Sequence, residues 1–306
     1  RYYSCPFAYF LEYVLGARPR KQAALTADQT GTLVHYILEQ ALKRAGAGFV
    51  DLSETELADL AAAVTREYVA ANMPGAGARF EYLIQRLQKS ASALLAFIQA
   101  EQRQGSFRPV AFELGIGDGP DQVPPVVLTT KTGETVRMIG KIDRVDACRE
   151  GGRTWLRVVD YKTGSKEFLL EDVRRGLNCQ MLVYLFTLVR NAGGAFQDPA
   201  PAGVLYLPAR DAVLAGSRSM SESERRRAMD RELQRKGLIL DEPEVLSAME
   251  HAGPEGIRFL PVKVSSRTGA ITGDALVSAE RLGRLERHTG HILNAIAAEL
   301  AAGNIS

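Results

Sequence analysis

The chain has few cysteines and no long uninterrupted hydrophobic run. Its 306 residues include only three cysteines, Cys5, Cys148 and Cys179, which are widely spaced. This argues against a disulfide framework and indicates a reducing compartment. No apolar run approaches the roughly 20 residues that a membrane-spanning helix needs, and no signal-peptide pattern is present. The sequence therefore predicts a cytoplasmic protein without a membrane segment.

A strong excess of either charge is also absent. Lysine and arginine total 38 and aspartate and glutamate 36, which leaves a formal net charge of +2. Any contact with nucleic acid must therefore depend on local basic clusters. Gly140-Lys141 lacks both the following Ser or Thr and the upstream glycine spacing of a phosphate-binding loop, so we expect no ATP binding.

The most informative stretch is GKIDRVDACREGGRTWLRVVDYK, residues 140–162. It contains two strand-like runs joined by a polar, glycine-rich turn; the first carries Asp143 and the second ends in Asp160-Tyr161-Lys162. Side chains alternate between the faces of a strand, so Asp160 and Lys162 point the same way. Apolar strands seldom carry charges unless these are paired or bind a metal. Taken alone, an Asp-x-Lys pattern at the end of a strand is more often a solvated surface ion pair.

Further elements follow from hydrophobic periodicity and turn residues. Helices are expected over 26–46, beginning with a capping box at Thr26 and Gln29, and over 53–71, 79–104, 170–189 and 278–302. Strands are expected over 108–117, 126–130, 134–145, 155–162, 203–207 and 258–264.

We predict one domain over residues 1–306. Its parts are a helical N-terminal region (1–107), a catalytic sheet core (108–208), a charged peripheral excursion (209–256) and a final strand and helix (257–306). The chain begins with Arg1 rather than methionine, and both ends resemble cut points, so we expect a fragment of a longer protein.

Polar residues on three expected elements are candidates for a site. His35 lies beside the apolar stripe of the first long helix, and Glu113 is the only acid of the 108–117 strand. Gln180 and Tyr184 stand at i and i+4 and share a helix face. His35 and the Gln180–Tyr184 pair each have a purely structural alternative, namely a core or surface histidine and a solvated helix edge. The pair His288 and His291 has no neighbouring acid or cysteine cluster, so we interpret both as surface residues.

Four motifs occur in a fixed order: Gly31-Thr-Leu-Val-His35, Gly140-Lys-Ile-Asp143-Arg144, Asp160-Tyr161-Lys162-Thr-Gly164 and Gln180-x-x-x-Tyr184. Together they resemble the RecB-like branch of the PD-(D/E)XK nuclease superfamily, and within it the C-terminal nuclease domains of the AddB (RexB) type. The resemblance implies an α/β fold with a restriction-endonuclease-like core, in which helices flank a central mixed sheet.

The resemblance also implies roles for particular residues. The divalent metal, Mg²⁺ or Mn²⁺, would be bound by His35, Asp143, Asp160 and the backbone carbonyl of Tyr161. Lys162 would orient the attacking water and offset negative charge, with Glu113 as an auxiliary acid. The residues expected to contact DNA are Gln180, Tyr184, Lys166, Arg174 and Arg175.

The implied function is hydrolysis of DNA single strands delivered by a helicase motor during double-strand-break repair and recombination. The implied partners are single-stranded or duplex-end DNA and an AddA-like helicase–nuclease subunit in a heterodimer. Two alternatives stay open. One is a catalytically silent scaffold that binds DNA ends, and the other is a stand-alone exonuclease of the RecB family.

Cys5 matches the early ligand of the 4Fe-4S cluster that AddB-type nuclease domains are expected to hold. Such a cluster needs four thiolates, and this chain has only three cysteines, none at C-x-x-C spacing. We therefore expect the cluster in the full-length protein but not in this chain.

Overall fold

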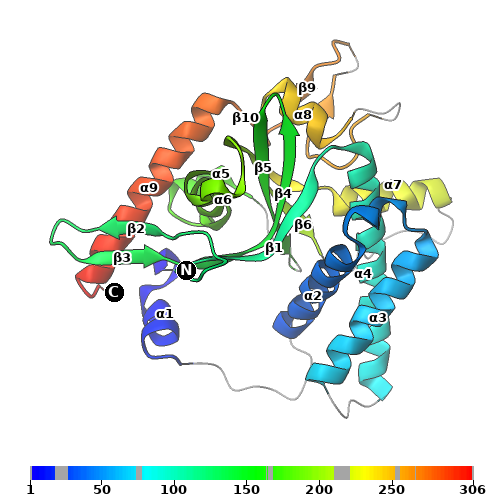
Figure 1. Ribbon diagram of the computed structural model, residues 1–306, viewed down its shortest axis with the longest axis horizontal. Coiled ribbons are helices and arrows are strands. Elements are labelled where there is room, and N and C mark those ends of the chain that lie inside the picture. Colours follow the sequence, from blue (N-terminus) through cyan, green and yellow to red (C-terminus); the bar gives the residue numbers. More distant parts are fainter. Residues whose placement is uncertain are drawn as a thin grey trace.

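A mixed six-stranded sheet forms the centre of the molecule, with helices on both sides (Figure 1). The strand order is β1-β4-β5-β6-β7-β10. The β5–β6 and β7–β10 pairs are parallel, and the other three pairs are antiparallel. The strands are β1 (Arg108–Ile116), β4 (Gly140–Glu150), β5 (Arg153–Lys162), β6 (Pro199–Pro208), β7 (Lys236–Leu240) and β10 (Leu276–Val277). This confirms the predicted α/β fold with a central mixed sheet.

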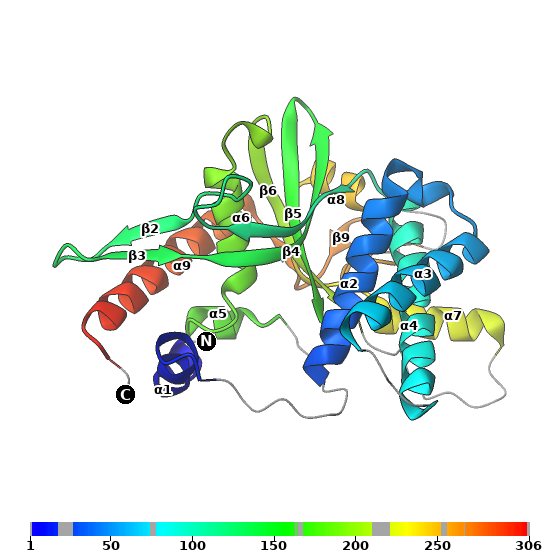
Figure 2. The same ribbon diagram turned by 60° about the horizontal axis from the view of Figure 1, so that its bottom comes forward.

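The helices form two groups on opposite sides of the sheet (Figure 2). The first group is α2 (Ala27–Ala45), α3 (Glu54–Asn72) and α4 (Ala78–Gln104), and the second is α5 (Leu170–Arg174), α6 (Gln180–Asn191) and α9 (Ala279–Ala301). The computed structural model describes residues 2–17, 27–73, 78–162, 164, 168–209, 221–251, 256–265 and 267–304. The predicted capping residue Thr26 lies outside these ranges. Among the described residues, no helix combines the length and the apolar character needed to cross a membrane.

The strand β5 lies at the centre of the core because most of its residues on both faces are apolar. Every residue from Thr154 to Tyr161 is buried. The predicted glycine-rich turn before it is present, and Gly151 and Gly152 have φ angles of 62° and 79°. Two consecutive positive φ angles match the twist of a tight hairpin, and glycine adopts them without a steric penalty. The turn therefore fixes the β4–β5 register that aligns the acidic residues.

The region 126–145 differs from the single hairpin predicted for it. β2 (Val126–Thr129) pairs with β3 (Thr135–Met138) as a separate two-stranded ribbon, which extends away from the body of the molecule (Figure 2). After the exposed Ile139, the chain enters β4, which pairs with β1 instead. The predicted second strand is thus divided between two sheets.

The helix predicted over 170–189 is also divided, into α5 and α6. Between them Gly176 has a φ of 77° and Asn178 a φ of 53°, values that a continuous right-handed helix cannot contain. The ring of Tyr3 packs against Gly176, where a Cβ would lie 2.4 Å from Tyr3 Cδ2. The N-terminal segment therefore contacts the break between the two helices.

Both described ends of the chain lie close together. The short helix α1 (Pro6–Tyr9) is capped by Cys5, whose sulfur accepts from the Ala8 amide, and it continues as a π-helical turn, Phe10–Val14. The hydroxyl of Tyr2 donates to the backbone carbonyl of Asn304 at 2.5 Å.

Part of the segment 209–256 belongs to the sheet, although the sequence suggests a peripheral excursion. α7 (Glu222–Leu233) is polar, but β7 pairs with β6, and Leu238 and Ile239 are fully buried. α8 (Pro243–Met249) also buries its apolar residues. The abundance of charged residues around β7 obscures a strand of only five residues.

The strand predicted over 258–264 is mostly absent. Only Lys263–Val264 is a strand (β8), paired with β9 (Ile271–Thr272). The preceding amides bind a side chain instead of a neighbouring strand, since the Glu250 carboxylate accepts from the backbone nitrogens of Arg258, Phe259 and Leu260 at 2.6 to 3.1 Å. The buried carboxylate of Glu250 thus accepts from backbone amides that the sequence pattern assigned to a strand.

Candidate metal and catalytic site

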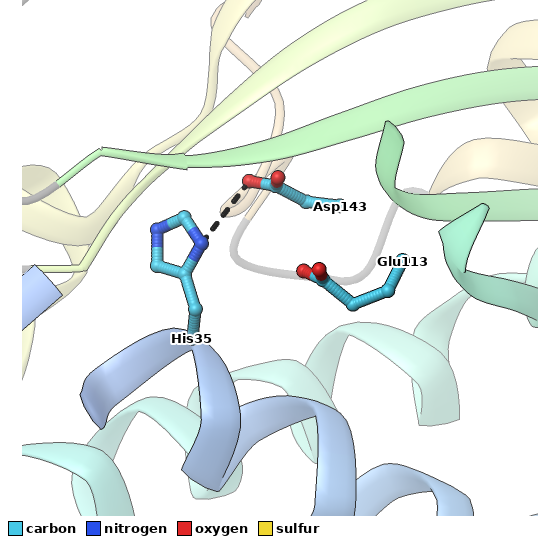
Figure 3. Close-up of side chains that lie close together, drawn as sticks. All are labelled: His35, Glu113 and Asp143. Carbon is cyan, nitrogen blue, oxygen red and sulfur yellow. Dashed lines mark ion pairs between the residues drawn. The ribbon is translucent and has the colours of Figure 1, made fainter. Parts of the chain in front are cut away.

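Three side chains from separate elements point into one space (Figure 3). They are His35 of α2, Glu113 of β1 and Asp143 of β4, and one ligand atom of each lies within 4.8 Å of the others. His35 Nδ1 is 3.4 Å from Asp143 Oδ2. An imidazole and two carboxylates suit Mn²⁺ or Mg²⁺, because carboxylate oxygens are hard ligands and the imidazole favours manganese somewhat.

Glu113 reaches this space through an unusual backbone conformation. The β1 partners Leu114 and Phe112 pair with the two residues that flank Asp143, so Glu113 lies opposite Asp143. Its φ of 50° is in the left-handed region, which non-glycine residues seldom adopt. Such a conformation costs on the order of 1–3 kcal/mol and persists where surrounding structure enforces it, often at functional sites. The strand therefore bends where it supplies a carboxylate.

The hydrogen bond of His35 determines which ring nitrogen faces the acids. Nε2 lies 2.9 Å from the carbonyl oxygen of Tyr161, which can only accept, so Nε2 carries the proton. In a neutral imidazole Nδ1 is then a bare lone pair, and it faces a carboxylate oxygen of Asp143. Two lone pairs in this arrangement repel each other unless a cation or proton lies between them. Metal-binding histidines commonly donate their other nitrogen to a backbone carbonyl in this way.

The acids of the site also favour a bound cation. Burial and, after it, the charge of Asp160 raise the pKa of Asp143 to about 6, although His35 and the Tyr161 amide act to lower it. The Tyr161 amide donates to Asp143 Oδ2 at 3.1 Å. A buried carboxylate with a raised pKa binds either a proton or a metal. These residues therefore fit a divalent metal.

Asp160 and Lys162 form an ion pair beside this group. Asp160 is buried and Lys162 is partly exposed. The predicted alternation is present, because the ring of Tyr161 points to the other face, where it contacts the Arg144 guanidinium. The solvated surface pair that the sequence left open is thus excluded for Asp160.

The converging residues differ in part from the predicted ligand set. Glu113, expected as an auxiliary acid, is one of the three side chains with suitable metal-ligand spacing. Asp160 is close enough to raise the pKa of Asp143 but is paired with Lys162. The carbonyl of Tyr161, predicted as a ligand, accepts from His35. The ligand roles of Asp160 and Tyr161 stay predictions.

Gln180 and Tyr184 meet the start of β4. Gln180 Nε2 donates to the Tyr184 hydroxyl at 3.0 Å, and the backbone nitrogen of Lys141 approaches the same oxygen at 3.4 Å. A Cβ on Gly140 would lie 2.6 Å from that hydroxyl. Tyr184 thus occupies the space that a side chain at position 140 would fill. The glycine of one motif therefore makes room for the tyrosine of the other, although the two motifs are 40 residues apart in sequence.

The remaining predicted residues lie elsewhere. Arg174 is the last residue of α5 and Arg175 follows it; both are exposed and pair with Glu171, at 3.4 and 3.2 Å. Lys166 lies outside the described residues. Cys5 is exposed directly before α1, whereas Cys148 is buried in β4, and the chain's three cysteines fall short of the four thiolates of a 4Fe-4S cluster.

Two residues at the site were not predicted. Lys141 forms an ion pair with Glu113, which raises the pKa of the lysine. Tyr206 of β6 pairs in register with Asp160, and the Lys162 ammonium lies 5.4 Å from the centre of its ring. The GKID motif offered a signal for Lys141, since the lysine follows Gly140 directly. No sequence signal points to Tyr206, because its place depends on the parallel β5–β6 register.

This arrangement agrees with a comparison against known families. The family described as the PD-(D/E)XK nuclease superfamily matches residues 1–262. The chain belongs to this superfamily. Its sheet, with Asp143 and Asp160-x-Lys162 on adjacent strands, confirms the family predicted from the four motifs.

Curated relatives extend the match to the whole chain. A protein of Acetivibrio thermocellus, named as one subunit of an ATP-dependent helicase/deoxyribonuclease, is 30% identical over 314 residues, which is 100% of this chain and 27% of that protein. Proteins with the same name from Clostridioides difficile (28% over 316 residues) and Clostridium botulinum (30% over 314 residues) show the same coverage. The chain thus spans 27% of the length of the curated relatives it matches.

Proposed function

We propose that the chain is a divalent-metal-dependent deoxyribonuclease domain that hydrolyses phosphodiester bonds of single strands. The observation that carries this proposal is the convergence of His35, Glu113 and Asp143 beside the ion pair of Asp160 and Lys162. The nuclease family and the relatives' names support it. By analogy with the helicase named in those relatives, single strands would be delivered by a motor, with an AddA-like protein as partner, during DNA break repair.

Each residue has a role that its surroundings support. His35, Glu113 and Asp143, with Asp160 beside them, would hold Mg²⁺ or Mn²⁺. The bound metal would supply positive charge at the phosphoryl oxygens and acidify a water. Lys162 is aligned by Asp160 and by the Tyr206 ring, so its ammonium can donate to the attacking water or to a phosphoryl oxygen. The Tyr161 carbonyl fixes the ring of His35.

The silent scaffold is a weaker proposal on physical grounds. A module that only binds DNA ends does not require a buried aspartate, a carboxyl group with a raised pKa and a glutamate in the left-handed backbone region, all close to one point. All three features oppose folding and are balanced when a cation binds. The stand-alone exonuclease uses the same chemistry and differs only in its partners.

The test is metal-dependent cleavage of an end-labelled single-stranded oligonucleotide, measured with Mg²⁺, with Mn²⁺ and with EDTA. Asp160→Asn and Lys162→Met should each abolish cleavage while circular dichroism stays unchanged. The matched control is Asp118→Asn, which alters an exposed aspartate paired with Arg137. Unchanged cleavage in a folded Asp160→Asn variant would contradict the proposal. DNA binding by the wild type without cleavage under any metal would favour the silent scaffold.

A further inference from the structure

Lys141 is a second lysine beside the acids of the candidate site. It stands two residues before Asp143 on β4, so the two side chains share a face of that strand. Its ammonium group forms an ion pair with Oε2 of Glu113. On β5, Lys162 stands two residues after Asp160 and pairs with it. Each of the two central strands thus supplies one acid and one lysine.

Both lysines lie at the same end of the β4–β5 hairpin. The strands are antiparallel, and the pair of their register that is farthest from the connecting turn is Arg144 with Val159. The next residues outward are the two aspartates, and the lysines stand two positions beyond them. A phosphoryl group held at the acids would therefore meet an ammonium group on each strand.

The position of Lys141 is fixed from two sides. Its backbone nitrogen approaches the Tyr184 hydroxyl at 3.4 Å, and its side chain is held by Glu113. The hydrogen bond to Glu113 raises the pKa of Lys141, and the charges of Asp143 and Glu39 act in the same direction. The ammonium group therefore stays charged at neutral pH.

The pair of Lys141 and Glu113 differs from an ordinary surface ion pair. In the pair of Arg137 and Asp118, both side chains are exposed. Glu113 is only 26% exposed and has a left-handed backbone conformation, and its carboxylate lies within 4.8 Å of the other two ligand groups drawn in Figure 3. A carboxylate has two oxygens, so Glu113 can bind a metal and Lys141 at the same time.

The charges of the site match one divalent cation better than two. Three ionised carboxylates, those of Glu113, Asp143 and Asp160, face the two ammonium groups of Lys141 and Lys162. One divalent metal changes the net charge from one negative to one positive, whereas two metals would leave three positive charges in a partly buried site. Excess buried charge is costly. An ammonium group already neutralises a carboxylate that a second metal would need.

We propose that Lys141 takes the place of a second divalent cation, so that the site binds a single metal ion. The proposal deepens the proposed function and rests on it. In two-metal nucleases the ions lie about 3.5–4 Å apart and stabilise the attacking and the leaving oxygen. Here the metal would be held by His35, Asp143 and Glu113, and the Lys141 ammonium would donate to a phosphoryl oxygen. Its side chain is 62% exposed and so can meet a strand that binds from solvent.

The number of bound metal ions tests this proposal without any cleavage. Free Mn²⁺ is measured by electron paramagnetic resonance while the wild type and its variants are titrated. The wild type should bind about one ion per chain, and Lys141→Arg, which keeps the charge, should do the same. Lys141→Met leaves the Glu113 carboxylate without an ammonium partner and should bind about two. Two ions that share Glu113 are magnetically coupled, so the spectrum of the bound ions should broaden in Lys141→Met alone.

Two further variants show whether the released carboxylate of Glu113 is responsible. Arg137→Met is the matched control, because it releases the exposed carboxylate of Asp118 and should add no metal ion. Glu113→Gln combined with Lys141→Met should return the number of bound ions to about one. Lys141 and Arg137 are both exposed, so these variants should fold, and circular dichroism checks this.

Two bound ions in the wild type, or one in a folded Lys141→Met variant, would overturn the proposal. A second ion in Arg137→Met would also overturn it, because any released carboxylate would then recruit a metal. The two proposals fail separately. One ion in the wild type and two in Lys141→Met, without cleavage by either, would contradict the nuclease assignment and support the role of Lys141. Cleavage by a wild type that holds two ions would contradict the role of Lys141 alone.

Discussion

Arg144 and Asp146, two residues apart on β4, form a two-point ion pair that is wholly buried. Arg144 Nε lies 2.8 Å from Asp146 Oδ1, and Nη2 donates to Oδ2 at 2.9 Å. Arg157 of β5 binds the same carboxylate at 2.9 Å and reaches Glu101 of α4 at 3.2 Å. Glu101 also pairs with Arg235. Three guanidinium groups and two carboxylates thus connect the sheet to α4.

This buried network is connected to the candidate site through Tyr161. Arg144 Nη1 donates to the Tyr161 hydroxyl at 3.3 Å, and the Tyr161 carbonyl accepts from His35. Burial by itself would raise the pKa of Glu101, but the charges of Arg235 and Arg157 outweigh burial and hold the pKa at about 2. Each buried charge is therefore tolerated only because its partners are in place.

Removal of one partner should consequently be costly. Glu101→Gln leaves Arg157 and Arg235 buried without their shared carboxylate, so we expect a loss of roughly 3–5 kcal/mol in the free energy of unfolding. Urea denaturation measures it. Glu67→Gln is the matched control, because Glu67 makes a two-point pair with Arg44 at the surface, and it should have little effect. Equal midpoints for the two variants would show that the network contributes no stability.

Local patterns predicted those features that depend on a few neighbouring residues. The alternation of Asp160 and Lys162, the Gly151-Gly152 turn and the helices α3, α4 and α9 each follow from spacing within one segment. The division of the 126–145 and 170–189 regions could not be predicted, because it depends on contacts with distant elements.

Long-range relationships explain what sequence patterns missed at the site. Glu101 and Arg235 are 134 positions apart, and nothing near either residue indicates the other. Tyr206 reaches Asp160 only through strand register. Glu113 joins His35 and Asp143 because its backbone adopts a positive φ, which the residue type disfavours.

The contact of Gly140 with Tyr184 yields a prediction about packing. Gly140→Ala places a methyl group 2.6 Å from the Tyr184 hydroxyl, so the ring must move, at a cost of about 1–3 kcal/mol in stability. In a Tyr184→Ala background the same substitution should cost almost nothing, because the clash is gone. A double-mutant cycle from urea midpoints checks this. Additive effects of the two substitutions would contradict the packing argument.

Asp143 should make the metal-free chain less stable at neutral pH. Its folded-state pKa of about 6 exceeds its ordinary value of 3.8. Between these values the folded state holds a proton that the unfolded state has lost, so stability falls as pH rises through this window and then levels off. The destabilisation above pH 6 is roughly 2–3 kcal/mol.

Asp143→Asn should therefore stabilise the chain in EDTA at pH 7.5, since an amide oxygen can still accept from the Tyr161 amide. The advantage should shrink as the pH falls from about 6 towards 4. Urea midpoints at several pH values measure the difference, with the exposed Asp118→Asn as the control. Saturating Mn²⁺ should reverse the order at pH 7.5, because only the wild type keeps its carboxylate for the metal. A pH-independent difference between the two proteins would disprove the raised pKa.

We predict that His35 makes the proposed site discriminate between metals. Its Nδ1 faces Asp143 and Nε2 is bonded to Tyr161, so His35→Ala removes one nitrogen ligand and should lower the affinity for Mn²⁺ at least about tenfold. The affinity for Mg²⁺ should fall less, because magnesium gains less from an imidazole. His35→Gln can still donate to the Tyr161 carbonyl while it presents an oxygen, so it should recover Mg²⁺ binding better than Mn²⁺ binding. Electron paramagnetic resonance of free Mn²⁺, with Mg²⁺ as competitor, measures both affinities.

His288→Ala is the matched control, since the ring of His288 likewise lies near a backbone carbonyl, 3.3 Å from that of Val173. If His35→Ala binds Mn²⁺ as tightly as His288→Ala does, the histidine is not a ligand and the metal lies nearer Asp160.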